Sequence, residues 1–242
     1  MQYDPIKRSL GNFFNSSPLL RKLFYYLLDL LLLRSWHVKR AFNNYAKKKD
    51  AANILDAGMG FGQYSYFMAR QNPSFIVKGV DVKPEQVKDC TLFFKSIKQD
   101  NASFALADLT KLVEENNYDF ILSVDVMEHI EEDVLVFKNF FKSMKRGGML
   151  LISTPSDKGG SDVHDESEES FIDEHVRDGY SIDDITEKLK GAGFREVSAL
   201  YTYGRPGNIS WRISMKYPIK MLNKSYLFFI QFSYTIQNSN QS

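Results

Sequence analysis

The stretch that decides the fold is Asn53-Ile54-Leu55-Asp56-Ala57-Gly58-Met59-Gly60-Phe61-Gly62. A short apolar run ends in an acidic residue, three glycines follow at alternate positions, and a helix-like segment, 63–70, comes directly after. Strand, glycine turn and helix in this order are typical of a nucleotide site in an α/β sheet, because glycine lets backbone amides approach a ligand. A dinucleotide fingerprint counted from Gly58 would need glycine at Gln63, whereas the third glycine here is Gly62.

Asp56 is predicted to lie at the end of the first strand. Its negative charge would repel a pyrophosphate, but it would suit a ligand that carries an ammonium and a sulfonium group. The pattern Asp-x-Gly-x-Gly-x-Gly resembles the first motif of class I S-adenosylmethionine-dependent methyltransferases. The alternative is a glycine turn that only closes an ordinary strand–helix unit.

Length and composition indicate one soluble α/β domain with extensions. The chain has 242 residues, of which 25% are charged and 43% hydrophobic. Its one cysteine, Cys90, excludes an intramolecular disulfide and a cysteine-clustered metal site, and it fits a reducing compartment. The first dozen residues contain no apolar segment typical of a signal peptide, so we expect a cytoplasmic protein.

Charge is strongly segregated along the chain. Residues 1–50 and 188–242 each carry a net charge of +7, whereas residues 157–187 carry −10. Such asymmetry bears on partners rather than on fold. Residues 156–180 are polar and acidic, and we expect them to form a mobile cover over the active site.

An N-terminal helical extension is expected over residues 1–50, with one helix from Leu19 to about Tyr45. Its centre, 23–33, has one charged residue in eleven, is too short to span a bilayer, and is apolar on nearly every face. This pattern favours either a helix that covers the cofactor site or one that lies on a membrane surface, with flanking basic residues. The two interpretations are compatible.

Strands and helix-length segments alternate over residues 51–204. This rhythm predicts an α/β fold with a doubly wound, mostly parallel sheet. The predicted strands are 54–57, 74–81, 102–107, 118–124, 147–154 and 194–203, and the predicted helices are 63–70, one opened by Pro84, 133–145 and one capped by Ser181. A C-terminal segment, 205–242, would hold a mixed stretch, a last strand over 226–236, and contacts to substrate or membrane.

The resemblance to methyltransferases extends beyond the glycine motif. The run 118–130, with Glu128-His129 near its end, resembles a signature common in the quinone-biosynthesis type of this superfamily. The segments 146–148, 153–155 and 180–194 are similar to that group as well. Over residues 52–203 the resemblance implies a Rossmann-like class I methyltransferase fold, S-adenosyl-L-methionine as cofactor, and a small-molecule or lipid-like acceptor.

The resemblance also implies roles for individual positions at the carboxyl ends of the strands, where such sheets bind ligands. Asp56 would lie near the cofactor's ammonium, the three glycines would line its methionine part, Asp81 would bind the ribose, and Asp108 and Leu109 would bind the adenine. Asp125 and Val126 would flank the transferred methyl group. The full predicted cofactor set is Asp56, Gly58, Gly60, Gly62, Asp81, Val82, Asp108, Leu109, Asp125 and Val126. For Asp108, the N-cap of a helix over 109–116 is an alternative.

A general base is needed only if the acceptor must lose a proton. The candidates are His129, His164, His175 and Glu128. We favour a structural role for Glu128 and His129, since adjacent helical residues do not face each other. Surface positions are the competing interpretation for His164 and His175. No histidine spacing typical of metal sites occurs, so we expect no metal.

Two other function classes compete with a methyltransferase. A nucleotide-binding oxidoreductase would also place an acidic residue near Asp81, but the alternate glycines and Asp56 argue against it. A non-catalytic homologue would keep the fold and lose the cofactor motifs, which are intact here. No Asn-Pro-Pro-Tyr-type motif follows the fourth strand, so we expect no nucleic-acid substrate. The two basic ends suggest an anionic membrane surface as a partner, unless they simply cover the core.

Overall fold

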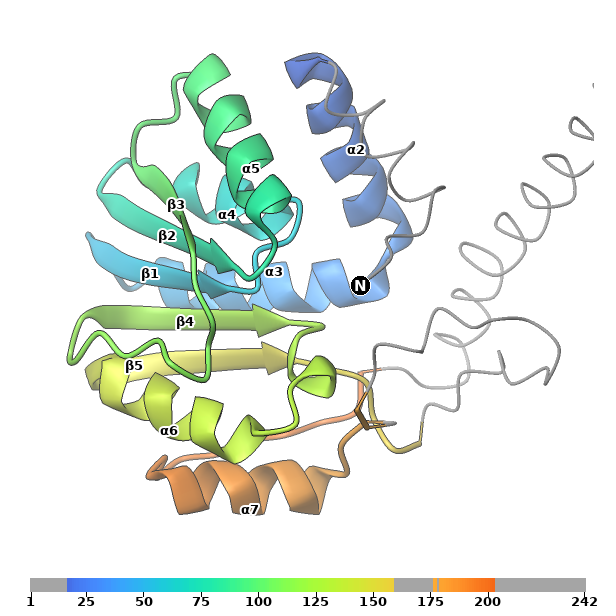
Figure 1. Cartoon of the computed structure of the whole chain (residues 1–242), viewed down its shortest axis with the longest axis vertical. Coiled ribbons are helices and arrows are strands. Elements are labelled where there is room, and N and C mark those ends of the chain that lie inside the picture. Colours follow the sequence, from blue (N-terminus) through green and yellow to red (C-terminus); the bar gives the residue numbers. More distant parts are fainter. Residues whose placement is uncertain (1–16, 159–175, 178, 203–242) are drawn as a thin grey trace, which may run out of the picture.

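Five parallel strands form the centre of the fold. The structure is a computed structural model, and it describes residues 17–158, 176–177 and 179–202. The strand order is β3-β2-β1-β4-β5, so the order in which the chain adds strands reverses between β1 and β4, while all strands run in the same direction (Figure 1). In such sheets ligands bind at the carboxyl ends of the strands beside this reversal. The strands are β1 (Ala52–Ala57), β2 (Phe75–Asp81), β3 (Ala102–Leu106), β4 (Tyr118–Val124) and β5 (Met144–Ser153).

Helices cover both faces of the sheet (Figure 1). One face packs against α3 (Leu33–Ala46) and α4 (Gln63–Ala69), and the other packs against α6 (Asp133–Ser143). Successive residues of β4 point to opposite faces of the sheet. Phe120 belongs to the buried cluster with α3 and α4, and Ile121 belongs to the buried cluster with α6. This two-sided burial explains the near-continuous apolar strands and confirms the predicted doubly wound sheet.

Two outer helices extend these layers. Helix α5 (Pro84–Ser96) lies against β2 and β3, and α7 (Ile182–Ala192) lies against α6. The predicted N-terminal ends of both helices are confirmed. Pro84 occupies the first turn of α5, and the Ser181 hydroxyl oxygen caps α7 by accepting a 3.0 Å hydrogen bond from the amide of Asp184.

The prediction of one N-terminal helix is wrong, because the segment forms two. Helix α2 (Pro18–Leu31) and α3 are separated by Leu32, whose φ of −100° and ψ of 109° are extended. Neither glycine nor proline marks this break in the sequence. Packing fixes it instead: Tyr25 of α2 joins a cluster with the phenylalanines of α5, whereas Phe42 of α3 is buried against the sheet.

Two other predicted elements do not form. Residues 194–202 contain no strand, so β5 is the last strand of the sheet among the described residues. The β propensity of this segment was not enough to form a strand, because strand formation depends on pairing with a neighbour. Residues 109–116 form turns rather than the alternative helix behind Asp108. The elements expected beyond residue 202, and most of the acidic segment 156–180, lie outside the described residues.

Candidate active site

The glycine loop after β1 bends through three left-handed glycines. Gly58, Gly60 and Gly62 have φ values of +78°, +51° and +74°. Such values favour glycine because a Cβ atom would be strained there. The amides of Gly58 and Met59 both donate to the carbonyl oxygen of Val80, at 2.9 and 3.0 Å, so the loop is fastened to the end of β2.

The loop's surroundings differ from one glycine to the next. A Cβ atom on Gly58 would lie 2.3 Å from Cγ2 of Val126, so the loop contacts the segment after β4 directly. A Cβ atom on Gly60 would meet nothing within 4 Å, so Gly60 borders open space at the carboxyl edge of the sheet. That space is where the predicted cofactor would lie.

Asp81 joins this loop at the end of β2. Its Oδ2 accepts a 3.0 Å hydrogen bond from the Gly60 amide, and its Oδ1 accepts one of 2.9 Å from the amide of Lys83. The neighbouring Val82 is exposed. The structure therefore brings Asp81 and the glycine loop together, as the sequence predicted; the ribose contact itself stays a prediction.

Asp56 is buried beneath the loop. Its Oδ2 accepts a 2.5 Å hydrogen bond from the Ser65 hydroxyl of α4. Burial raises the pKa of this carboxyl to about 6, although the bonds from Ser65 act in the opposite direction. The side chain thus holds α4 to β1, and its predicted position near the ammonium stays a prediction.

Asp108 follows β3 in a tight turn. Its Oδ1 accepts hydrogen bonds from the amide and the hydroxyl of Thr110, at 2.9 and 2.7 Å, and Lys111 lies 3.1 Å from Oδ2. The bonds from Thr110 hold the pKa of Asp108 below its usual value. Leu109 is buried next to it. Both residues lie on the expected strand end, and their contact with adenine stays a prediction.

The segment after β4 begins with a left-handed aspartate. Asp125 has φ +51°, its amide donates to the Ser153 carbonyl at 2.8 Å, and its carboxylate forms an ion pair with Arg34 of α3. The N-terminal extension therefore reaches the strand end at which the sequence placed the transferred methyl group. Arg34 was not among the predicted site residues.

Glu128 and His129 lie in η1 (Met127–His129), a single 3₁₀ turn after β4. Glu128 is 1% exposed, and its Oε2 accepts a 3.2 Å hydrogen bond from the hydroxyl of Thr154. Burial, and then the charge of Asp125, raise the pKa of Glu128 to about 7. The Nε2 atom of His129 lies 3.9 Å from Oε1 of Glu128, beyond hydrogen-bond range. These contacts favour the structural role that the sequence suggested for Glu128.

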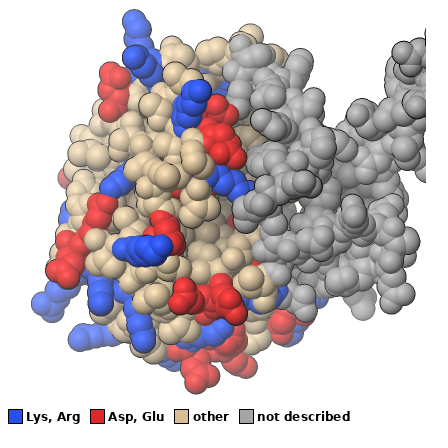
Figure 2. All heavy atoms as spheres, in the orientation of Figure 1, with Lys and Arg blue, Asp and Glu red and all other residues tan. Residues whose placement is uncertain are grey.

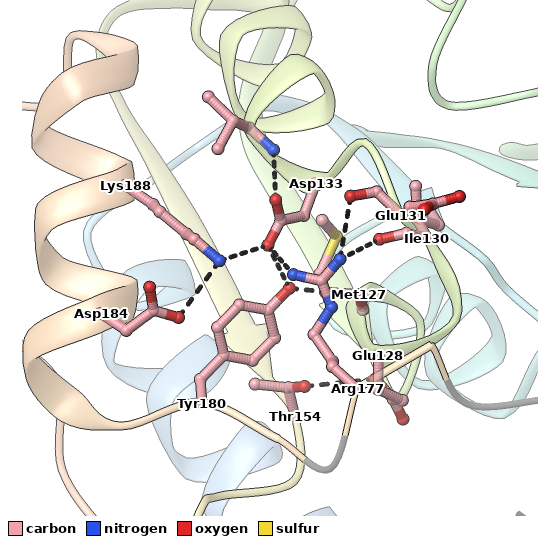
Figure 3. Close-up of polar contacts among 11 residues, drawn as sticks. Met127, Glu128, Ile130, Glu131, Asp133, Thr154, Arg177, Tyr180, Asp184 and Lys188 are labelled. Carbon is pink, nitrogen blue, oxygen red and sulfur yellow. Dashed lines mark hydrogen bonds and ion pairs between the residues drawn. The ribbon is translucent and has the colours of Figure 1, made fainter.

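A second carboxylate, Asp133 at the start of α6, organises the chain behind this turn (Figure 3). Its Oδ2 accepts hydrogen bonds from the Tyr180 hydroxyl at 2.8 Å and from Nζ of Lys188 at 2.9 Å, and it pairs with Arg177. Burial alone would raise the pKa of Asp133, but the hydrogen bonds from Lys188 and Tyr180 and the charge of Arg177 together hold it below its usual value. Sequence reasoning missed this network, since the partners of Asp133 lie 44 to 55 residues after it in the chain.

The same network holds the turn after β4 in place. The second guanidinium nitrogen of Arg177 donates to the carbonyls of Ile130 and Glu131, at 2.6 and 3.0 Å, and the amide of Val176 donates to the carbonyl of Glu128 at 3.0 Å. Figure 3 shows Arg177 and Tyr180 converging on this segment from the chain that precedes α7. Residues returning from the acidic segment therefore help to build the carboxyl edge.

Two of the predicted catalytic residues, His164 and His175, lie outside the described residues. Within the described part, no group of three or more His, Cys, Asp or Glu side chains could hold a metal ion. The ten predicted cofactor residues, in contrast, all lie at or beside the carboxyl ends of β1 to β4.

Comparison with known proteins identifies this arrangement. Residues 48–193, more than half of the chain, match a family described as a methyltransferase domain. The chain belongs to this methyltransferase family. Its cofactor is S-adenosyl-L-methionine, and the match argues against the oxidoreductase alternative. Gly60, which borders open space and donates its amide to Asp81, fits this cofactor.

Among curated relatives of this methyltransferase, a phosphoethanolamine N-methyltransferase of Triticum aestivum is 30% identical over 152 residues, which are 62% of this chain and 29% of the relative. The (S)-coclaurine N-methyltransferase of Papaver somniferum is 29% identical over 147 residues, 61% of this chain and 39% of the relative. The chain thus spans well under half the length of the curated relatives it matches.

A solved structure extends the likeness in fold. The phosphoethanolamine N-methyltransferase 2 of Haemonchus contortus, in complex with S-adenosyl-L-methionine, has a TM-score of 0.66 and 17% identity. The match covers 91% of this chain and 51% of that chain. The doubly wound sheet described above therefore has the same fold as this solved methyltransferase.

Proposed function

We propose that the protein transfers a methyl group from S-adenosyl-L-methionine to a small-molecule acceptor that carries an amine. The observation that carries this proposal is the carboxylate of Asp125 at the end of β4, which pairs with Arg34, is 30% exposed, and directly precedes Val126, the residue that contacts Gly58 of the glycine loop. This carboxylate would accept a hydrogen bond from an amine and orient it. The names of the first relatives, which are N-methyltransferases, support the same acceptor class.

The chemistry requires mainly positioning from the protein. The cofactor supplies a methyl group on a sulfonium, and the amine's lone pair forms the new N–C bond as the S–C bond breaks and a thioether leaves. Held in line by the site, the two reactants meet at high effective concentration. The amine must be neutral to attack, so a group at the β4 end has to take its proton. Among the described residues His129 is the more accessible candidate base, since its side chain is 36% exposed and that of Glu128 is buried. His164 and His175 remain candidates outside the described residues.

Product detection tests this proposal. Purified protein is incubated with S-adenosyl-L-methionine labelled in its methyl group and with panels of primary amines, phenols and quinol precursors. We expect label in the amine panel, and less of it for Asp125→Asn. Label in the phenol panel alone would contradict the amine assignment. Cofactor binding without any product would favour a non-catalytic homologue.

We further propose that the acceptor is lipid-like and is reached at an anionic membrane surface. The support is the outer face of α2, where Leu19, Leu23, Tyr26 and Leu30 follow the i, i+4, i+7, i+11 spacing of one helix face. Their side chains are 76%, 47%, 63% and 67% exposed. None of the described helices is long and apolar enough to cross a membrane, so this stripe would lie on the surface.

Charge around this leucine stripe fits an anionic partner. Residues 17–50 contain eight Lys and Arg against two Asp. Arg21 is buried, and Arg34 and Lys39 pair with carboxylates, which leaves five basic residues that could face an anionic surface, each contributing about 1 kcal/mol. A hollow of about 500 Å³ beside the stripe is lined by aromatic rings, by Lys22, Lys39 and Arg70, and by one carboxylate, Asp29, which pairs with Lys39. In Figure 2 acidic side chains are most numerous at the lower end of the face, where Figure 1 places α7, and others lie beside basic side chains in its upper half.

Vesicle co-sedimentation tests the leucine stripe. The variant Leu19→Gln/Leu30→Gln removes its two most exposed leucines, and Leu135→Gln/Leu200→Gln removes two exposed leucines elsewhere as a matched control. We expect the wild type and the control to bind vesicles containing phosphatidylserine, and the stripe variant to bind several-fold less. Equal binding of both variants would contradict the surface assignment, and a change in oligomeric state of the stripe variant alone would identify a second copy as the partner.

A further inference from the structure

Helix α2 has an unusual distribution of side chains, because its leucines face outward and an arginine is buried. Arg21 is 2% exposed and lies in the N-terminal extension, outside the part of the chain that matches the methyltransferase family. A buried guanidinium is costly unless its hydrogen bonds are satisfied. Its partners therefore indicate why it is there.

Arg21 donates to two backbone carbonyls and to two side chains, and one of these is the Sγ atom of Cys90 at 3.2 Å. Its Nη2 donates to the carbonyl of Phe61 at 2.7 Å, and its Nη1 donates to the carbonyl of Asp89 in α5 at 3.0 Å. The guanidinium lies 4.7 Å from the ring centre of Phe93, and Nε donates to the Tyr25 hydroxyl at 2.8 Å. In the described part of the chain no carboxylate forms an ion pair with Arg21.

Phe61 is the residue between the second and third glycines of the cofactor loop. Its carbonyl accepts hydrogen bonds from two side chains of α2, since the Tyr25 hydroxyl donates to the same oxygen. Because the peptide group is planar, holding this carbonyl toward α2 fixes the orientation of the following amide of Gly62. These bonds add to those that the loop makes itself, since the amides of Gly58 and Met59 donate to Val80 and the amide of Gly62 donates to the carbonyl of Met59 at 2.8 Å. They restrict a loop in which left-handed glycines otherwise allow several conformations.

We propose that Arg21 is a positioning residue for the cofactor, and that it acts by holding the Phe61 carbonyl away from the cofactor space. The loop is then fixed in the form in which the Gly60 amide binds Asp81 and open space borders Gly60. The N-terminal extension is thus part of the cofactor site, although it lies outside the matched domain. This inference rests on the cofactor alone and not on the proposed acceptor.

A second contact from the extension supports this assignment. Nε2 of Gln63, the first residue of α4, donates to Oδ1 of Asp29 at 2.6 Å and to the Ser35 hydroxyl at 3.3 Å. The loop that holds the cofactor is therefore fixed at Phe61 by α2 and directly after Gly62 by residues on both sides of the break at Leu32.

Calorimetric titration with S-adenosylhomocysteine, the demethylated product, tests the role of Arg21. Arg21→Met keeps the length of the side chain and removes its donors, and Lys22→Met removes the same charge from an exposed neighbour on the same helix. We expect Arg21→Met to bind at least tenfold more weakly and Lys22→Met to bind within twofold of the wild type. Arg21→Lys can donate only part of the set, so it should recover part of the affinity.

The variant Tyr25→Phe separates positioning from folding, since it removes one bond to the Phe61 carbonyl and keeps the aromatic packing. We expect a threefold to tenfold loss of affinity with a melting temperature close to that of the wild type. If Arg21→Met and Tyr25→Phe lower the melting temperature while the folded protein binds within twofold of the wild type, Arg21 is structural only and the inference is wrong. Wild-type binding without methyl transfer to amines would contradict the proposed acceptor and leave this inference standing.

Discussion

The backbone amide of Gly60 donates a 3.0 Å hydrogen bond to the carboxylate of Asp81, which joins the loop after β1 to the end of β2. The Asp81 carboxylate therefore makes two structural hydrogen bonds. One carboxylate oxygen shapes the glycine loop, and the other accepts the amide of Lys83. This relationship explains why a loop of three left-handed glycines has one defined form.

Replacing Asp81 with asparagine should weaken cofactor binding by about 10-fold, because a charged acceptor contributes roughly 1.5–3 kcal/mol and the amide keeps part of the bond. Calorimetry with S-adenosylhomocysteine measures this change. Glu85→Gln, which changes an exposed carboxylate in the first turn of α5, serves as the control. Equal affinities for Asp81→Asn and the wild type would show that Asp81 does not contribute to cofactor binding.

The contact between Gly58 and Val126 predicts a double-mutant result. Gly58→Ala places a Cβ atom 2.3 Å from Cγ2 of Val126 at φ +78°, so we expect a loss of about 2–4 kcal/mol in the free energy of unfolding. Val126→Ala should recover most of the steric part, leaving about 1–2 kcal/mol of backbone strain. Denaturant unfolding of the four proteins gives the coupling, and strict additivity would show that the two residues do not touch.

Glu128 predicts a dependence of stability on pH. Burial raises its pKa in the folded protein to about 7, above the usual 4.5, so the charged form costs stability above pH 7 and this cost disappears as the pH falls toward 4.5. Glu128→Gln should therefore stabilise the protein at pH 8 by about 1–3 kcal/mol and change little at pH 5. Thr154 can still donate to the amide oxygen. Urea unfolding at both pH values measures the difference, and an unchanged or lower stability at pH 8 would contradict it.

The Asp133 network predicts a large effect of a single carboxylate. Asp133→Ala leaves Arg177 and Lys188 without their shared partner and should cost about 3–5 kcal/mol. Asp183→Ala removes an exposed carboxylate from the first turn of α7 and should cost about 0.5 kcal/mol. Since the pKa of Asp133 is lowered in the folded protein, its contribution is present above pH 4 and is lost as the pH falls through that pKa. Similar losses for the two variants would argue against the network.

The sequence predicted the strand ends well because apolar runs closed by acidic residues are local features. Asp56, Asp81 and Asp108 all lie where that pattern put them. The break at Leu32 and the absence of a strand over 194–202 depend on tertiary packing, so local propensity misled there. Arg21 illustrates the same limit, since a basic residue flanking an apolar run indicates exposure until α5 and the glycine loop are placed around it.

The most direct test of the cofactor site compares Gly60→Leu with Gly147→Leu. Both glycines are left-handed, with φ values of +51° and +79°, and a Cβ atom on either would meet nothing within 4 Å. The backbone strain is therefore similar, but only Gly60 borders the space assigned to the cofactor, whereas Gly147 lies near the start of β5. Calorimetric titration with S-adenosylhomocysteine should show wild-type affinity for Gly147→Leu and no binding for Gly60→Leu, with both proteins folded. Unchanged affinity in Gly60→Leu would contradict the site.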